Sequence, residues 1–273
     1  MKWHVLFLLL LLLLSACAPR QVVVEEPVTN PWTVRAESLA HSGVDAMGRE
    51  QWDRARMLFE RSLQAATLAG DERLVALAWY NIGRARASAG DDSAASQAFQ
   101  QAIGQAEGAG DAVNSRRASL ALALLSDTAT PKGDDTMLDV PAVYPIDIHL
   151  AAARLAALRG YDARARAAYE RVLDMAGKDR AGRLYAARAH LGLAELERVD
   201  NAPAAQQQLA RVMDILHRAG QPRLMLQALM LVAELEDDPA RRLQWQQRAE
   251  RLRSALHTDR PPPASGKQET DNQ

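Results

Sequence analysis

The side chains that most often perform chemistry are few in this sequence, and their spacing matches no catalytic pattern. Cys17 is the only cysteine, and neither a Gly-x-Ser-x-Gly elbow nor a Walker-type glycine loop occurs. No two histidines have the spacing of a His-Glu-x-x-His metal site. We therefore expect no catalytic residue, no metal ion and no cofactor, and we predict that the protein is not an enzyme. The histidines are His4, His41, His149, His190, His217 and His257.

Paired acidic residues and a glycine cluster are better explained by helix ends than by catalysis. A carboxylate at a helix start accepts hydrogen bonds from free backbone N–H groups, and glycine is favoured where a helix ends. We predict such structural roles for Asp91-Asp92, Asp134-Asp135, Asp237-Asp238 and Gly108-Ala109-Gly110-Asp111.

The N-terminus has the pattern of an export signal. A weakly basic start, with Lys2 and His4, precedes the unbroken apolar run Val5–Leu14. A helix of that length would rise about 15 Å, roughly half the hydrocarbon thickness of a bilayer, so it is too short for a stable span. A short apolar run behind a basic start and before small residues is typical of a signal peptide.

The end of this run, Leu14-Ser15-Ala16-Cys17, resembles the lipobox of bacterial lipoproteins. The resemblance implies that residues 1–16 are a cleaved signal peptide and that Cys17 carries acyl chains such as palmitate. Apart from this covalent lipid, no bound group is expected. In that family an aspartate after the cysteine favours the inner membrane. Ala18 therefore implies the periplasmic side of the outer membrane. Two alternatives stay open: an ordinary signal with an incidental cysteine, and retention at the inner membrane.

The composition of the remaining chain favours helix. Alanine, leucine, arginine, glutamate and glutamine dominate, and only 5% of the residues are aromatic. The formal net charge of −1 argues against a nucleic-acid partner. Three prolines and no helical period predict a flexible, lipidated tether at 17–34. A proline run followed by polar residues predicts a disordered tail at 258–273.

An internal repeat of about forty residues lies between tether and tail. Small and aromatic residues follow Trp79-Tyr80 at a characteristic spacing. Forty positions earlier, several of the same residue types stand at the matching positions. The later set is Gly83, Gly90, Ala95, Phe99 and Ala102, and the earlier set is Gly43, Glu50, Ala55, Phe59 and Ser62. This pattern resembles the tetratricopeptide repeat (TPR), in which small residues let two helices approach closely. The resemblance implies an all-α, TPR-like right-handed solenoid of five to six antiparallel helix pairs, over 35–125 and 147–257.

The repeat is interrupted at 126–146 by an irregular connection that contains prolines. Proline removes a backbone donor and clashes with the preceding turn, so no full second helix is expected there. The apolar stretch from Met137 to Ile146 is too hydrophobic to stay in solvent. We predict that it packs as an extended segment, either in place of the missing helix or in the groove of the array.

The resemblance also implies where a partner binds, because the first helix of each TPR unit lines the inner face of the array. Arginines among leucines there would bind a peptide and its carboxylates. An alternative is that several of these leucines belong to the core. We expect a protein partner in the cell envelope, in pilus or secretin assembly or in the regulation of cell-wall synthases or hydrolases. The alternative function is that of a cell-wall enzyme or a glycan-binding subunit of an envelope complex. The predicted groove residues are Tyr80, Arg84, Leu120, Leu124, Leu150, Arg154, Leu193 and Leu196.

Overall fold

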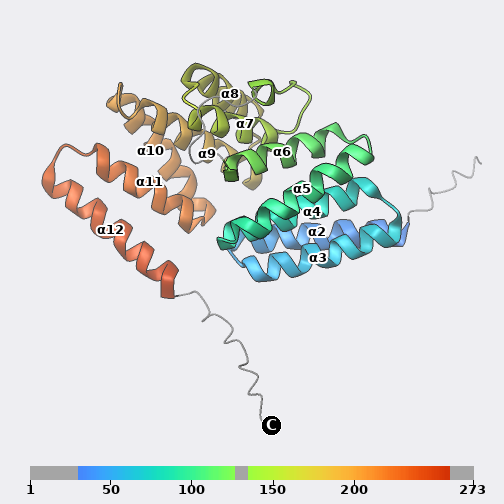
Figure 1. Cartoon of the computed structure of the whole chain (residues 1–273). Helices are drawn as coiled ribbons and strands as arrows, with labels where there is room; N and C mark the ends of the chain where they lie inside the picture. Colours follow the sequence, from blue (N-terminus) through green and yellow to red (C-terminus); the bar gives the residue numbers. More distant parts are fainter. Residues whose placement is uncertain (1–29, 127–134, 259–273) are drawn as a thin grey trace, which may run out of the picture.

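The computed structural model describes residues 30–126 and 135–258, and within these ranges every regular element is a helix (Figure 1). The predicted signal peptide, Cys17, most of the tether and nearly all of the predicted tail lie outside the described residues. The elements are α2 (Pro31–Gly48), α3 (Trp52–Ala69), α4 (Glu72–Ala89), α5 (Asp92–Gly108), α6 (Ala112–Ser126), the 3-10 helix η1 (Asp135–Leu138), α7 (Ile146–Leu158), α8 (Asp162–Met175), α9 (Arg180–Glu197), α10 (Ala202–Ala219), α11 (Pro222–Leu235) and α12 (Pro239–Thr258).

The helices pack in successive pairs, which confirms the predicted all-α, TPR-like solenoid. The pairs are α2 with α3, α4 with α5, α7 with α8, α9 with α10, and α11 with α12. Helix α6 packs on α5 and α7 and has no second helix of its own in the described chain.

The tether prediction was wrong at its C-terminal end, because α2 already begins at Pro31. The backbone N–H of Trp32 donates to the Asn30 side chain at 3.0 Å, so Asn30 is the N-cap of the helix. Proline is favoured in the first turn, where its missing N–H has no partner to lose. Counting Pro31 among the prolines of the tether placed the start of this helix too late.

Close contacts between glycine and an aromatic ring set the spacing inside the first two pairs. A Cβ atom placed on Gly83 would lie 2.6 Å from Cδ1 of Phe99, and Gly43 is covered by Phe59 in the same way. Phe59 and Phe99 are fully buried. These contacts explain why glycine and phenylalanine recur together in the repeat.

Capping residues start several of the helices. The carboxylates of Asp91 and Asp111 accept hydrogen bonds from the backbone N–H of Ala94 at 3.2 Å and of Asn114 at 3.0 Å. Asp238 accepts one from the N–H of Ala240 at 2.8 Å. The predicted structural roles of these three aspartates are confirmed.

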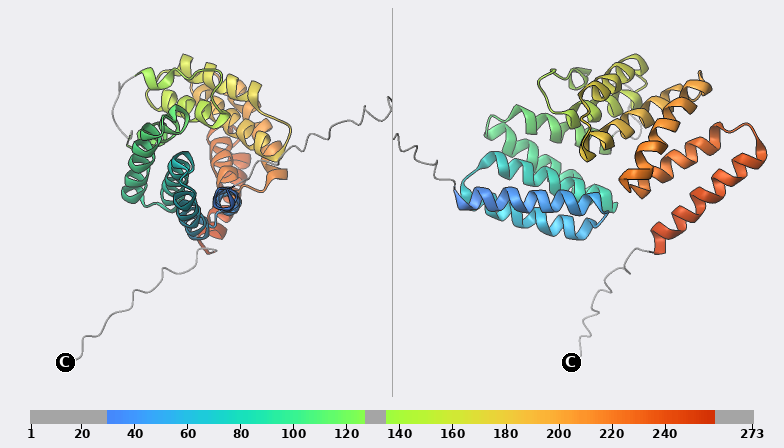
Figure 2. Two further views of the ribbon diagram at one scale, coloured as in Figure 1. Left: turned by 90° about the vertical axis from the view of Figure 1, so that its right-hand side faces the viewer. Right: turned by 180° about the vertical axis from the view of Figure 1, so that it is seen from behind.

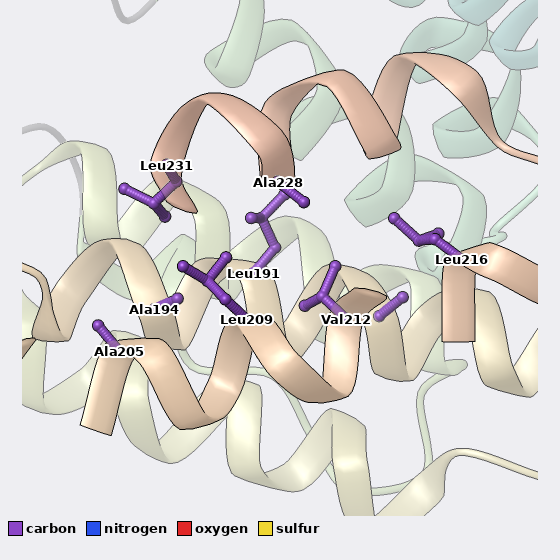
Figure 3. Close-up of a cluster of buried hydrophobic side chains, with 9 residues drawn as sticks. Leu191, Ala194, Ala205, Leu209, Val212, Leu216, Ala228 and Leu231 are labelled. Atoms are coloured by element: carbon purple, nitrogen blue, oxygen red, sulfur yellow. The ribbon is translucent and has the colours of Figure 1, made fainter. Parts of the chain in front are cut away.

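The C-terminal half has a continuous hydrophobic core between three helices (Figure 3). Leucines of α9, α10 and α11 meet there, and Leu209 and Leu216 are each only 2% exposed. Burial at about 25 cal/mol per Å² of apolar surface stabilises the stacking of one pair on the next.

The connection after α6 packs where a second helix is missing. Leu138, Val140 and Tyr144 contact a buried cluster that includes Leu120 and Ile148. The predicted packing against the array is confirmed for these side chains but wrong for Val143, which is 86% exposed, and the predicted extended form is wrong. η1 and a turn closed by the Tyr144 N–H on the Pro141 carbonyl, at 3.0 Å, shorten the segment instead.

The array curves with its first helices inside. Successive first helices contact each other, α2 with α4, α4 with α6, α7 with α9 and α9 with α11, whereas successive second helices in the described chain have no comparable contacts. The left view of Figure 2 accordingly shows the helices arranged around a common centre.

Candidate functional site

Charged and aromatic side chains from four first helices come together on the inner side of the array. Their charges act on one another although they are far apart in the sequence. We call them the inner-face cluster: Tyr80 and Arg84 of α4, Arg117 of α6, Asp147 and Arg154 of α7, and Tyr185 and Arg188 of α9.

Tyr80 lies between two arginines. The guanidinium carbons of Arg84 and Arg117 are 5.6 and 5.7 Å from the centre of its ring, within the range of cation–π attraction. Burial raises the pKa of the Tyr80 hydroxyl, and the positive charge of Arg84 opposes that shift. The phenol therefore stays neutral and serves as an aromatic surface with a polar tip.

Arg117 is held in place by two partners. Its Nε donates to Oδ2 of Asp147 at 2.7 Å, and its Nη1 donates to the side-chain oxygen of Asn114. Burial alone would lower the pKa of Arg117, but the hydrogen bond and charge of Asp147 outweigh it and raise that pKa. Because Asp147 is occupied in this way, its charge is largely compensated.

Arg188 is the least compensated charge of the cluster. Burial lowers the pKa of Arg188, and the nearby positive charges of Arg84 and Arg154 lower it further, while Tyr185 opposes the shift. Among the described residues, no carboxylate forms an ion pair with any of these three arginines. Glu195 interacts with Arg154 through its charge, but no ion pair in the described chain holds the three guanidiniums. Arg188 with two other arginines nearby favours a bound anion, and guanidinium groups bind carboxylates with paired hydrogen bonds.

The structure brings three of the predicted groove residues into this cluster, namely Tyr80, Arg84 and Arg154. Two others, Leu124 and Leu196, are half-buried and pack against core clusters. All five lie on first helices.

For the remaining three predicted residues the groove assignment was wrong. Leu120, Leu150 and Leu193 are only 0%, 7% and 3% exposed, and they belong to the core. The reason is that neighbouring first helices contact each other, so these leucines fill the space between them.

Sequence reasoning missed Arg117, Asp147, Tyr185 and Arg188. Opposite charges thirty residues apart, at 117 and 147, were a weak signal of contact between neighbouring first helices. No such signal marked the two residues of α9. Leu191 and Leu193 are buried in different core clusters, whereas Tyr185 and Arg188 interact with Arg84 of the first helix α4.

Comparisons with known proteins agree with this architecture for part of the chain. A family model described as tetratricopeptide repeat matches residues 35–107, which is the region of the first two helix pairs. No curated protein matches the sequence. The chain is an all-α, TPR-like array, and residues 35–107 match tetratricopeptide repeats, which generally mediate contacts between proteins.

The described ranges hold neither a candidate metal site nor a candidate membrane-spanning helix. Within 30–126 and 135–258, no cluster of three or more histidine, cysteine or acidic side chains has a geometry suited to a metal ion. Over the same ranges, no helix combines the length and apolar character that crossing a membrane requires.

Proposed function

We propose that this protein is a lipid-anchored periplasmic scaffold that binds an acidic segment of a partner protein on its inner face. The observation that carries the proposal is the group formed by Arg84, Arg154 and Arg188, on three different first helices and without ion-pair partners in the described chain. An extended peptide that crosses α4, α7 and α9 would place its carboxylates on these guanidiniums. Tyr80 and Tyr185 would contact the apolar parts of the peptide.

The location in the envelope rests on the lipobox-like Leu14-Ser15-Ala16-Cys17. Acyl chains on Cys17 would hold the array at the outer membrane, because two or three chains anchor a protein stably where one does not. The class of partner that fits is an assembly factor or a cell-wall synthase or hydrolase with an exposed acidic segment.

Fluorescence anisotropy with two labelled ten-residue peptides tests the binding mode. One peptide alternates glutamate and leucine, and the other has glutamine in place of glutamate. We expect the acidic peptide to bind more tightly, and Arg188→Ala to weaken it by about 10- to 100-fold, the loss of one or two charge-assisted hydrogen bonds. Arg188→Lys should recover part of the affinity, because it keeps the charge but not the planar fork.

Arg61→Ala is the matched control, since Arg61 is exposed on the second helix α3. Equal binding of both peptides, or equal losses from Arg61→Ala and Arg188→Ala, would contradict the proposal. The alternative of a glycan-binding subunit predicts binding to purified peptidoglycan that does not depend on these arginines.

A further inference from the structure

The two halves of the array meet at a point that the TPR pattern does not require. The turn between α2 and α3 contacts the start of α11, across 173 positions of sequence. Figures 1 and 2 show the α10–α11 turn beside the α2–α3 turn from each side. The described chain thus closes on itself at this contact.

The contact consists of reciprocal helix capping. The side chain of Gln221 donates to the Gly48 carbonyl, in the last turn of α2, at 2.9 Å. In return the Glu50 carboxylate accepts hydrogen bonds from Nε of Arg223 at 2.9 Å and from its backbone N–H, in the first turn of α11, at 3.3 Å. Each helix end therefore has backbone groups satisfied by the other, and a carboxylate at the N-terminus of α11 also suits the helix dipole. The guanidinium of Arg223 lies 5.2 Å from the centre of the Trp52 ring.

Glu50 stands where this fold otherwise uses glycine. Five helices end in a left-handed residue whose N–H bonds back to the last turn, and that residue is glycine each time: Gly70, Gly90, Gly110, Gly160 and Gly220. At the end of α2 the same hydrogen-bond pattern holds, but the residue is Glu50, with φ 59°. It is the one residue other than glycine with positive φ in the described chain, and this conformation is unfavourable for a residue with a Cβ. Its side chain is 15% exposed, and its carboxylate binds Arg223.

We propose that Glu50, Gln221 and Arg223 form a latch that closes the array into a ring and fixes its curvature. A strained glutamate at a glycine position is explained if its carboxylate is needed for closure. The closure itself does not depend on the proposed function. Its consequence, that the latch sets the spacing of Arg84, Arg154 and Arg188, does rest on it. The latch is an ion pair with a half-exposed arginine, so salt should weaken it.

Distance measurement between two spin labels tests the latch. Cys17 is the only cysteine, so the full chain with Cys17→Ala accepts single labels at Gln64→Cys in α3 and Gln227→Cys in α11, both exposed. We expect one narrow distance distribution in this parent. Glu50→Gly and Arg223→Ala should each give a longer and broader one, and the double variant should add nothing to either. Raising the salt concentration should broaden the parent distribution and leave both variants unchanged.

Two comparisons make the test specific. Glu60→Ala removes the ion pair between Arg56 and Glu60 inside α3, so it should keep the narrow distribution. Glu50→Gly should melt at a higher temperature than Arg223→Ala, because both open the latch but only the former relieves the strained turn. Parent-like distances in both latch variants would overturn the proposal, and so would a lower melting temperature for Glu50→Gly than for Arg223→Ala. If a latch variant binds the peptide more weakly while its spin-label distances stay those of the parent, the latch proposal is wrong and the effect lies at the inner face.

Discussion

Replacing Gly83 with alanine tests how tightly the helices of one repeat unit are packed. The new Cβ atom would lie 2.6 Å from Cδ1 of Phe99, a ring that is fully buried and cannot swing away into solvent. Overpacking of this kind costs about 1–3 kcal/mol. Alanine in a helix interior also gains about 1 kcal/mol over glycine, which offsets part of that loss.

Gly104→Ala separates the two effects. Gly104 lies in α5, and nothing stands within 4 Å of the place where its Cβ would be. Both variants gain the same helix propensity, so the difference between them isolates the clash with Phe99. We expect Gly104→Ala to raise stability by about 0.5–1 kcal/mol and Gly83→Ala to fall below it by about 1–3 kcal/mol.

Thermal and urea unfolding followed by far-UV circular dichroism measure this difference. For a domain of this size it corresponds to a gap of about 2–12 °C in melting temperature. Phe99→Leu combined with Gly83→Ala should recover part of the loss, because the smaller side chain makes room. Equal melting temperatures for Gly83→Ala and Gly104→Ala would refute the packing argument.

Three further predictions concern protonation, a buried carboxylate and the anchor. Burial lowers the pKa of His149 and of His190 below 6.5. As the pH falls below 6.5, the unfolded chain therefore binds protons at these histidines before the folded chain does. The contribution of these two histidines to the free energy of unfolding is therefore fully present above pH 6.5 and is lost as the pH falls through the folded pKa values. The urea midpoint of the double His→Gln variant should depend less on pH in that range. Arg166→Ala should lower the unfolding free energy by about 1 kcal/mol, because it leaves Glu197, only 8% exposed, without its ion-pair partner; an unchanged urea midpoint would contradict this. Cys17→Ala should abolish metabolic labelling with palmitate and release the protein from membranes, and sedimentation with membranes after a high-salt wash would refute the lipid anchor.

The overall fold could be predicted from the sequence because its determinants are local. Gly43 with Phe59 and Gly83 with Phe99 repeat a contact between two adjacent helices, and such contacts have a fixed spacing along the chain. The starts of helices could also be predicted from the sequence, because Asp91 and Asp111 cap the helices that follow them.

The inner face was only partly predictable because it depends on how far neighbouring units approach. Leu150 and Leu193 occupy groove positions in the TPR pattern, yet the contact between α7 and α9 buries both. Arg188 has no place in that pattern, and its position became visible only from the packing of α9 on two sides. The latch between Glu50 and Arg223 joins residues 173 positions apart, and no local spacing indicates such a contact.

Site-specific photocrosslinking in the native cell tests the central claim most directly. Leu158 lies at helical spacing from Asp147 and Arg154 on α7 and is 60% exposed, and Leu68, on the second helix α3, is 55% exposed. A photoreactive amino acid at 158 should crosslink to a partner protein, whereas the same group at 68 should not. The crosslink at 158 should disappear when Arg188 is changed to alanine. Equal crosslinking at both positions, or a crosslink at 158 that persists in the Arg188→Ala variant, would contradict binding through the inner-face arginines.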